Sequence, residues 1–145
     1  MINSTQPIQV FLIYAHKNRK IVYKLYQRLI KDGINVWLDA ERLRPGQDWK
    51  HEIRKAILKS AVVIVCLSRD FDQQQGYRYE ELKLALDKAS VLSEDEVFII
   101  PVRLEKCNTP ESLQHLHRVD LFISGGYKRL LRVLQGEVVR GISPL

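Results

Sequence analysis

Two continuous apolar runs constrain the fold of this chain more than any other feature of its sequence. Residues 61–68 read AVVIVCLS and residues 97–104 read VFIIPVRL. Such runs are typical of strands covered on both faces, as in parallel sheets flanked by helices. They are far shorter than the ~20 apolar residues of a membrane-spanning helix, and Met1–Pro7 resembles no secretory leader. We expect a soluble, cytoplasmic α/β protein without a membrane partner.

Strand and helix patterns alternate along the rest of the chain. Further strands are expected at 9–14, 35–38 and 118–123, with helices at 17–31, 49–59, 76–89 and 127–134 and a short helix at 110–116. Parallel strands joined by helices require right-handed crossovers. The sequence therefore predicts a flavodoxin-like three-layer sandwich, in which a central five-stranded parallel sheet of order 2-1-3-4-5 has helices on both faces.

The second helix has a clear start signal. Asp48 is placed to cap it, and the helical spacing of Trp49, Ile53, Ala56 and Ile57 predicts one buried stripe. Trp37 and Trp49, which flank the loop Asp39–Asp48, are both expected to be core anchors rather than ligand contacts.

A chain of 145 residues fits one ordinary domain. We expect the domain to span residues 1–135. Residues 136–145 (GEVVRGISPL) show little periodicity. They are predicted to be a C-terminal tail or the start of a linker to a missing partner domain, such as a fused sensor.

Charge is unevenly distributed along the chain. Residues 1–60 hold twelve Lys/Arg against five Asp/Glu, whereas residues 61–145 hold eleven against twelve. Such polarity fits a nucleic-acid face, a surface that recognises its own opposite half, or simply solvated basic helices. Because no basic–aromatic interleaving or groove-reading motif accompanies the charge, we expect no specific nucleic-acid binding.

Cysteine and histidine usage argues against a metal site. Cys66 lies in an apolar run and Cys107 in a polar one, which makes neither a disulfide framework nor a four-ligand zinc set. His115 and His117 are two residues apart and have no third ligand near them in sequence. The prediction is that no metal is bound.

The strand order locates a candidate crevice. In open α/β sheets the ligand lies beyond the carboxyl ends of the strands, where the strand order reverses. The loops concerned are 14–17 and 69–76, with 39–48 alongside. None of them reads G-x-G-x-x-G or a Walker sequence, which argues against Rossmann-type dinucleotide binding and P-loop chemistry. A receiver domain would need an acidic pair where Ala15-His16 stands.

One carboxylate on the third helix stands out. At 100° per residue, the apolar stripe of residues 82, 85, 86 and 89 places Glu81 on the shoulder of the buried face and turns Glu80 outward. Tyr77 lies one turn earlier on the side of Glu81. The alternative interpretation makes Glu81 a surface partner of Arg78, and spacing alone does not decide between the two.

Several ordered motifs resemble the TIR (Toll/interleukin-1 receptor/resistance) domain of the bacterial kind, from Gln9 to about Leu134. They are VFLIYAH at the first strand, WLDAERLRPGQDW across the second strand and the so-called BB loop, IRKAILKSAVVIVCLS, and GYRYEELKLAL. Two positions depart from the family pattern. Ile13 stands where Ser is usual, and Tyr77 stands where many active members have Trp.

The resemblance implies that the chain cleaves NAD⁺ as an NAD⁺ hydrolase or ADP-ribosyl cyclase, with NAD⁺ as substrate rather than cofactor. Glu81 matches the catalytic glutamate of the family. By the same resemblance, residues Tyr14, Ala15, His16, Asp39 and Tyr77 are expected to bind the dinucleotide. The BB-loop residues Arg42, Leu43, Arg44, Pro45 and Gly46 are expected to form a head-to-tail interface with other TIR domains, with the acidic stretch 93–96 as a candidate partner.

Three functional hypotheses remain open from the sequence. The first is a self-assembling NAD⁺-consuming enzyme of bacterial signalling or anti-phage defence, and the second is a non-catalytic TIR adaptor that binds other TIR domains. The third is an enzyme resembling nucleoside deoxyribosyltransferases, which also use a glutamate on a helix. The presence of Glu81 favours an enzyme, whereas Tyr77 and Ile13 keep the adaptor open.

Overall fold

The computed structural model describes residues 8–38, 44–71, 76–93 and 95–142, apart from the side chains of 76–78 and 137–142. Its strands are β1 (Gln9–Ile13), β2 (Asn35–Trp37), β3 (Val62–Leu67), β4 (Ile99–Arg103) and β5 (Val119–Asp120). They form one sheet of order β2-β1-β3-β4-β5, and every neighbouring pair is parallel. The predicted strand order is confirmed.

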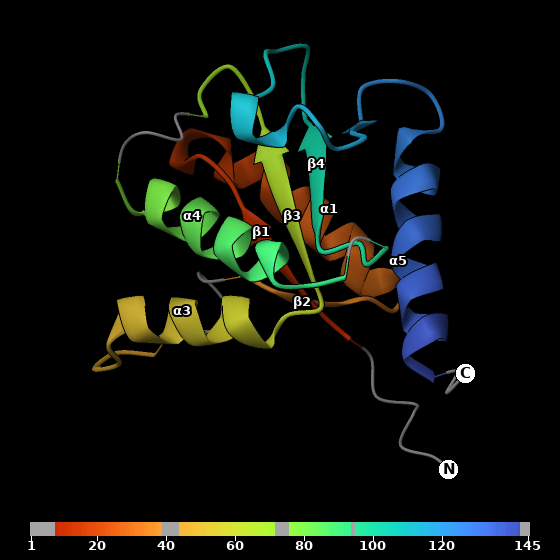
Figure 1. Cartoon of the computed structure of the whole chain (residues 1–145). Helices are drawn as coiled ribbons and strands as arrows, with labels where there is room; N and C mark the ends of the chain where they lie inside the picture. The colour runs from red at the N-terminus through yellow and green to blue at the C-terminus, as the bar shows by residue number, and fades with distance from the viewer. Residues whose placement is uncertain (1–7, 39–43, 72–75, 94, 143–145) are drawn as a thin grey trace.

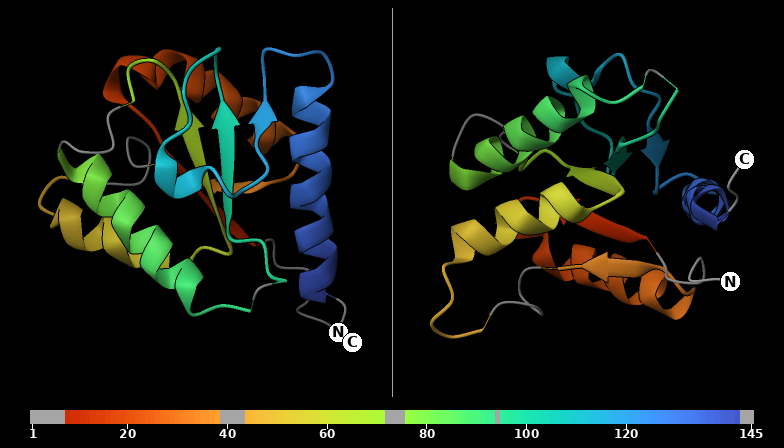
Figure 2. Two further views of the ribbon diagram at one scale, coloured as in Figure 1. Left: turned by 45° about the horizontal axis from the view of Figure 1, so that its top comes forward. Right: turned by 60° about the horizontal axis from the view of Figure 1, so that its bottom comes forward.

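Helices cover both faces of this sheet (Figures 1 and 2). The helices α1 (Arg19–Lys31) and α5 (Gly126–Ile142) pack on one face, and α3 (Trp49–Lys59) and α4 (Gly76–Ser90) pack on the other. Two short 3-10 helices, η2 (His16–Asn18) and η3 (Glu111–Leu113), complete the described elements. The expected three-layer flavodoxin-like sandwich is therefore the observed fold.

The central strand β3 divides the core into two clusters. All six of its residues are buried, and they alternate between the α1–α5 cluster and the α3–α4 cluster. Cys66 points into the first of these and is fully buried, which raises the pKa of its thiol to about 12. This thiol is a core residue, as the apolar run predicted, and is chemically inert at neutral pH.

The last strand is shorter than the predicted 118–123. Residues of β4 face β3 and β5 alternately: the N–H of Leu104 donates to the Leu67 carbonyl, whereas the Arg103 carbonyl accepts from the N–H of Leu121. Pro101 therefore faces β5 and, having no N–H, cannot extend that ladder. A turn follows at once, in which the N–H of Ile123 donates to the Asp120 carbonyl at 3.3 Å.

The last helix is longer than the predicted 127–134. It runs to Ile142, so residues 136–142 are helical rather than an irregular tail. Gly136 costs a helix only about 1 kcal/mol relative to Ala. Pro144 is the first residue in this region that a helix interior excludes.

Candidate functional site

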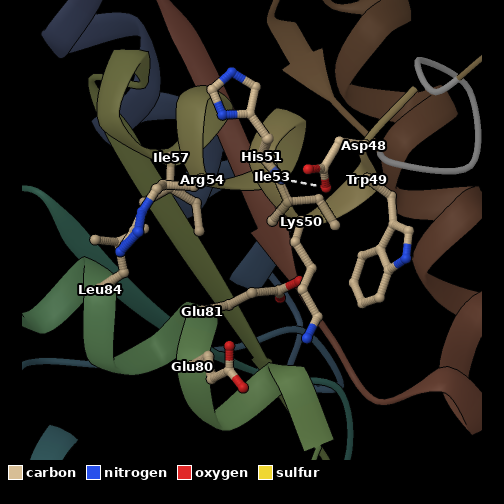
Figure 3. A pocket seen from close by; sticks show the side chains of 10 residues that line it. All are labelled: Asp48, Trp49, Lys50, His51, Ile53, Arg54, Ile57, Glu80, Glu81 and Leu84. Carbon is tan, nitrogen blue, oxygen red and sulfur yellow. Dashed lines mark hydrogen bonds between the residues drawn. The ribbon is translucent and has the colours of Figure 1, made fainter.

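The amino-terminal parts of α3 and α4 enclose a cavity of about 400 Å³ (Figure 3), within the usual size range of small-molecule sites. The cavity lies on the α3–α4 side of the sheet. It is lined by Asp48, Trp49, Lys50, His51, Ile53, Arg54, Ile57, Glu80, Glu81 and Leu84.

Asp48 fixes the start of the α3 wall. Its Oδ1 accepts a hydrogen bond from the N–H of His51 at 3.3 Å, and its carbonyl accepts from the N–H of Glu52 at 3.0 Å. The predicted helix cap is confirmed. The α3 wall of the cavity therefore begins at the cap, with Trp49 and Lys50 in the first turn of the helix.

Glu81 is the most buried of the three acidic residues that line the cavity. Its side chain is 8% exposed, whereas Glu80 is exposed, as the helical spacing predicted. In Figure 3 the Glu81 carboxylate reaches from α4 towards α3, while that of Glu80 is directed elsewhere. The side chain of Arg78 lies outside the described residues, so the alternative of a Glu81–Arg78 pair stays a prediction. A mostly buried carboxylate at a cavity is placed to act on charge in a bound molecule.

The α3 wall carries basic residues across the cavity from this carboxylate. Lys50, His51 and Arg54 line the cavity from α3, and Glu80 and Glu81 line it from α4. Opposite charges therefore face each other across the space. Sequence reasoning missed these basic residues, although their signal was present: they follow the Asp48 cap by two to six positions and fall outside the buried stripe.

Trp49 was expected to be a core anchor, and this prediction is wrong. Its side chain is 40% exposed and lines the cavity. The first turn of α3 lies before Ile53, the first buried residue of the helix, so an aromatic there has no core to enter. Trp37 does anchor the core, since it is 9% exposed and stacks on Phe11 with 5.2 Å between ring centroids.

The carboxyl-terminal ends of α3 and α4 are joined by Lys88. Its Nζ donates to the carbonyl oxygens of Leu58 and Ser60 at 2.7 and 2.8 Å and lies 4.6 Å from the centroid of the Phe98 ring. Partial burial lowers the pKa of this lysine. The bonds fix one end of the helix pair, opposite the end that forms the cavity.

The loop after β1 lies at the predicted crevice but is not part of the cavity lining. Ala15 is buried, His16 is exposed, and Tyr14 is half-buried against the α1–α5 cluster. A hydrogen bond joins the segments that follow β1 and β3: the Ser68 hydroxyl donates to Asn18 Oδ1 at 2.5 Å. The roles of Tyr14, Ala15 and His16 in binding stay predictions.

The BB loop is described only in part. Arg44, Pro45 and Gly46 are exposed, and the N–H of Arg44 donates to Gln47 Oε1 at 2.7 Å. Gly46 has a φ of 91°, which a residue with a side chain rarely adopts. Asp39, Arg42, Leu43 and the side chain of Tyr77 lie outside the described residues.

Two further findings concern the described residues alone. Among them, no three His, Cys, Asp or Glu side chains are grouped as a metal site would require. Within the same part of the chain, no helix combines the length and the apolar character that crossing a membrane demands.

These observations define a flavodoxin-like α/β domain with an acid–base cavity between two helices. The family model of the TIR domain matches residues 10–133. The chain therefore belongs to the TIR-domain family, as the motifs indicated.

A curated relative and two solved structures extend this result. The chain is 30% identical over 118 residues to the uncharacterized protein y4cD of Sinorhizobium fredii, matching 80% of this chain but only 18% of that protein's length. The TIR domain of the Toll-related receptor TRR-2 from Hydra magnipapillata has the same fold, with a TM-score of 0.72, 24% identity, and coverage of 87% of this chain and 97% of that one. The CMP N-glycosidase BcmB of Clostridium botulinum is more distant, with a TM-score of 0.56, 17% identity, and coverage of 86% and 98%.

Proposed function

We propose that this TIR domain is an enzyme that cleaves the nicotinamide–ribose bond of NAD⁺, with Glu81 as its catalytic residue. The observation that carries the proposal is the position of Glu81, which is 8% exposed and yet lines a cavity of about 400 Å³. Membership of the TIR family supports it. So does the occurrence of this fold in a CMP N-glycosidase, an enzyme that by its name also breaks an N-glycosidic bond.

The chemistry needs little beyond one carboxylate. When the C1′–N bond breaks, both of its electrons pass to the ring nitrogen, so the pyridinium leaves as neutral nicotinamide and needs no general acid. Positive charge moves to the ribose ring, and the Glu81 carboxylate stabilises it. Water then adds to C1′ and loses a proton, giving ADP-ribose, or a nitrogen of adenine adds and gives the cyclic product.

Substitution of Glu81 tests this role. Glu81→Gln keeps the shape of the side chain and removes its charge, so we expect NAD⁺ cleavage to fall by roughly 10²- to 10³-fold. Chromatography with mass spectrometry would quantify nicotinamide, ADP-ribose and cyclic ADP-ribose after incubation of the purified chain with NAD⁺. The thermal unfolding curve of Glu81→Gln should match that of the wild type.

Glu80→Gln is the matched control, because it changes the adjacent carboxylate on the same helix. It should retain most of the activity. Wild-type activity in Glu81→Gln, or loss of activity in Glu80→Gln alone, would show that the assignment is wrong. An assay for nucleobase exchange separates the enzyme proposed here from one resembling deoxyribosyltransferases.

The adaptor is the second candidate, and one observation favours it. Tyr77 stands where many active members have Trp, as the resemblance indicated. An adaptor would release no nicotinamide at any protein concentration and would bind other TIR domains equally well with Glu81→Gln. Ile13, the other departure, is fully buried among the residues under α3 and α4 and does not line the cavity.

We also propose that head-to-tail assembly raises the activity. The basic first 60 residues and the slightly acidic remainder give unlike surfaces, which favour open filaments or rings over two-fold dimers. The exposed BB-loop residues Arg44, Pro45 and Gly46 supply one side of the contact. Exposed acidic residues after α4, Asp95 and Glu96, supply a candidate other side.

Specific activity should accordingly rise with protein concentration and fall with added salt, which screens surface charge over ~8 Å at physiological ionic strength. Arg44→Glu should suppress the rise without changing thermal stability. Specific activity that is constant from nanomolar to high micromolar protein would show that each monomer has a complete site.

A further inference from the structure

The aromatic ring of Trp49 stands at the cavity rather than in the core. It is the first residue of α3 and is 40% exposed. The chain has two tryptophans, and the other, Trp37, is buried against Phe11. Trp49 therefore presents a large π surface beside Glu81 without a role in core packing.

This ring already attracts a cation in the structure. The Nζ of Lys50 lies 5.6 Å from the centroid of the Trp49 ring, within the ~6 Å range of a cation–π contact. In Figure 3 the Lys50 side chain extends into the space between the Trp49 ring and the Glu81 carboxylate. The cavity thus holds a positive charge near an aromatic face, and the Glu81 carboxylate lines the same space.

A flat aromatic cation would satisfy the same two partners better than an ammonium does. The nicotinamide of NAD⁺ is a pyridinium, and it combines a positive charge with a face that stacks on indole. Its reduced form and the free base are neutral. We propose that Trp49 is the platform for the pyridinium ring, in the place that the Lys50 ammonium takes here, so that the site selects cationic over neutral nicotinamide.

This inference rests on the proposed function and adds to it the step at which Trp49 acts. In the transition state the positive charge leaves the ring for the ribose, so the contact with Trp49 weakens as the bond breaks. Trp49 therefore contributes to binding rather than to the chemical step. Once nicotinamide is neutral it has lost the cation–π attraction, and Lys50 can return to the ring.

Two ligands that cannot be cleaved separate this inference from the activity. 1-Methylnicotinamide has the pyridinium charge, and nicotinamide has the same ring without it. We would titrate the full chain with each ligand, following amide chemical shifts, and expect the cation to bind roughly two- to thirty-fold more tightly. Quenching of the exposed Trp49 fluorescence by 1-methylnicotinamide should saturate at the same concentrations.

Two substitutions should act in opposite directions. Trp49→Leu removes the platform and should abolish the preference for 1-methylnicotinamide, whereas Lys50→Gln removes the competing cation and should strengthen binding of 1-methylnicotinamide several-fold. Trp49→Leu should also raise KM for NAD⁺ and raise kcat by a similar factor, leaving kcat/KM nearly unchanged, because the contact is made with the bound substrate and is lost before the transition state. Both positions are exposed, so neither substitution disturbs the core.

Phe122→Leu is the matched control. Phe122 is also an exposed aromatic beside a cation, 44% exposed and 5.4 Å from the Arg103 guanidinium, but it does not line the cavity. It should leave both affinities unchanged. Equal affinities of the two ligands for the wild type, or a preference that persists in Trp49→Leu, would overturn the inference. Absence of NAD⁺ cleavage would instead contradict the proposed function, because neither ligand reports on cleavage.

Discussion

The two faces of the sheet treat polar groups in opposite ways. On the α1–α5 face, charged and hydroxyl groups are used to join elements. Tyr127 donates its hydroxyl proton to Asp32 Oδ2 at 2.7 Å, and the Arg28 guanidinium lies 3.7 Å from the centre of the Tyr127 ring. Burial, with the adjacent Asp32 carboxylate, raises the pKa of Tyr127 well above its usual value. This tyrosine therefore stays protonated and ties α5 to the end of α1.

On the α3–α4 face the amino-terminal halves of the two helices direct polar groups into a cavity, whereas Lys88 joins the helices at their other ends. Lys50, Arg54, Glu80 and Glu81 line the same space from two helices. Groups placed this way contribute less to holding the fold than pairs in direct contact, but they are placed to meet a ligand. The comparison teaches that polar groups on the α1–α5 face stabilise the domain, while those at the amino-terminal end of the α3–α4 face are available for chemistry.

The largest expected effect, on the α1–α5 face, comes from Gly126→Ala. A Cβ on Gly126 would overlap the Asp120 carbonyl oxygen and lie 3.0 Å from its carbon, and both atoms are backbone. The loop between β5 and α5 would have to shift, so we expect the free energy of unfolding to fall by about 3 kcal/mol. Urea denaturation measures this loss. NAD⁺ cleavage by the fraction that stays folded should be unchanged.

Gly136→Ala, in the same helix, is its control. Nothing lies within 4 Å of a Cβ there, and the substitution should stabilise the helix by up to about 1 kcal/mol. If Gly126→Ala were as stable as the wild type, or lowered activity without lowering stability, the proposed difference between the two faces of the sheet would be wrong.

A smaller effect, and a pH-dependent one, is expected from Asp120→Asn at the end of β5. Arg103 Nε and Nη2 each donate to the Asp120 carboxylate at 2.8 Å, and the hydrogen bonds from Arg103 lower the pKa of Asp120. Because the pKa is lower in the folded than in the unfolded chain, the stabilisation is present above pH ~4 and is lost as pH falls through the folded value. We expect Asp120→Asn to cost about 2 kcal/mol at pH 7.

Urea denaturation at a series of pH values checks this prediction. The stability difference between wild type and Asp120→Asn should shrink steadily below pH 4. A difference that stays constant from pH 7 to pH 3 would show that the carboxylate charge contributes nothing, and the pair would then be a neutral hydrogen-bond contact only.

The fold was predictable because burial on both faces leaves a strong signature. The apolar runs that contain β3 and β4 have almost no polar residue. The helices that alternate with the strands indicate that neighbouring strands are parallel. The ends of elements were not predictable from the same signal. The start of β5 depends on Pro101, which faces it from the neighbouring strand, and its end depends on the turn that the Asp120 carbonyl closes with the N–H of Ile123. The first of these is a tertiary relation that local pattern does not show.

The candidate site, too, was predictable only where a local pattern determined it. The burial of Glu81 followed from its angle relative to the apolar stripe of α4, a local property. Trp49 shared the spacing of the buried stripe of α3, but that spacing does not show where the helix extends beyond the core. The cavity itself arises from two helices that are about 30 residues apart in sequence, and no motif marks their contact.

The bonds from Lys88 to the end of α3 have a mechanical consequence. The hydrogen bonds to the Leu58 and Ser60 carbonyls hold the carboxyl-terminal ends of α3 and α4 together, so the joint is a hinge for the helix pair. A small rotation about this joint would move the amino-terminal ends of the helices most, and it would change the width of the cavity between Trp49, at the start of α3, and Glu81, in the second turn of α4. The ammonium that joins the two helices thereby sets the axis about which the cavity would widen or narrow.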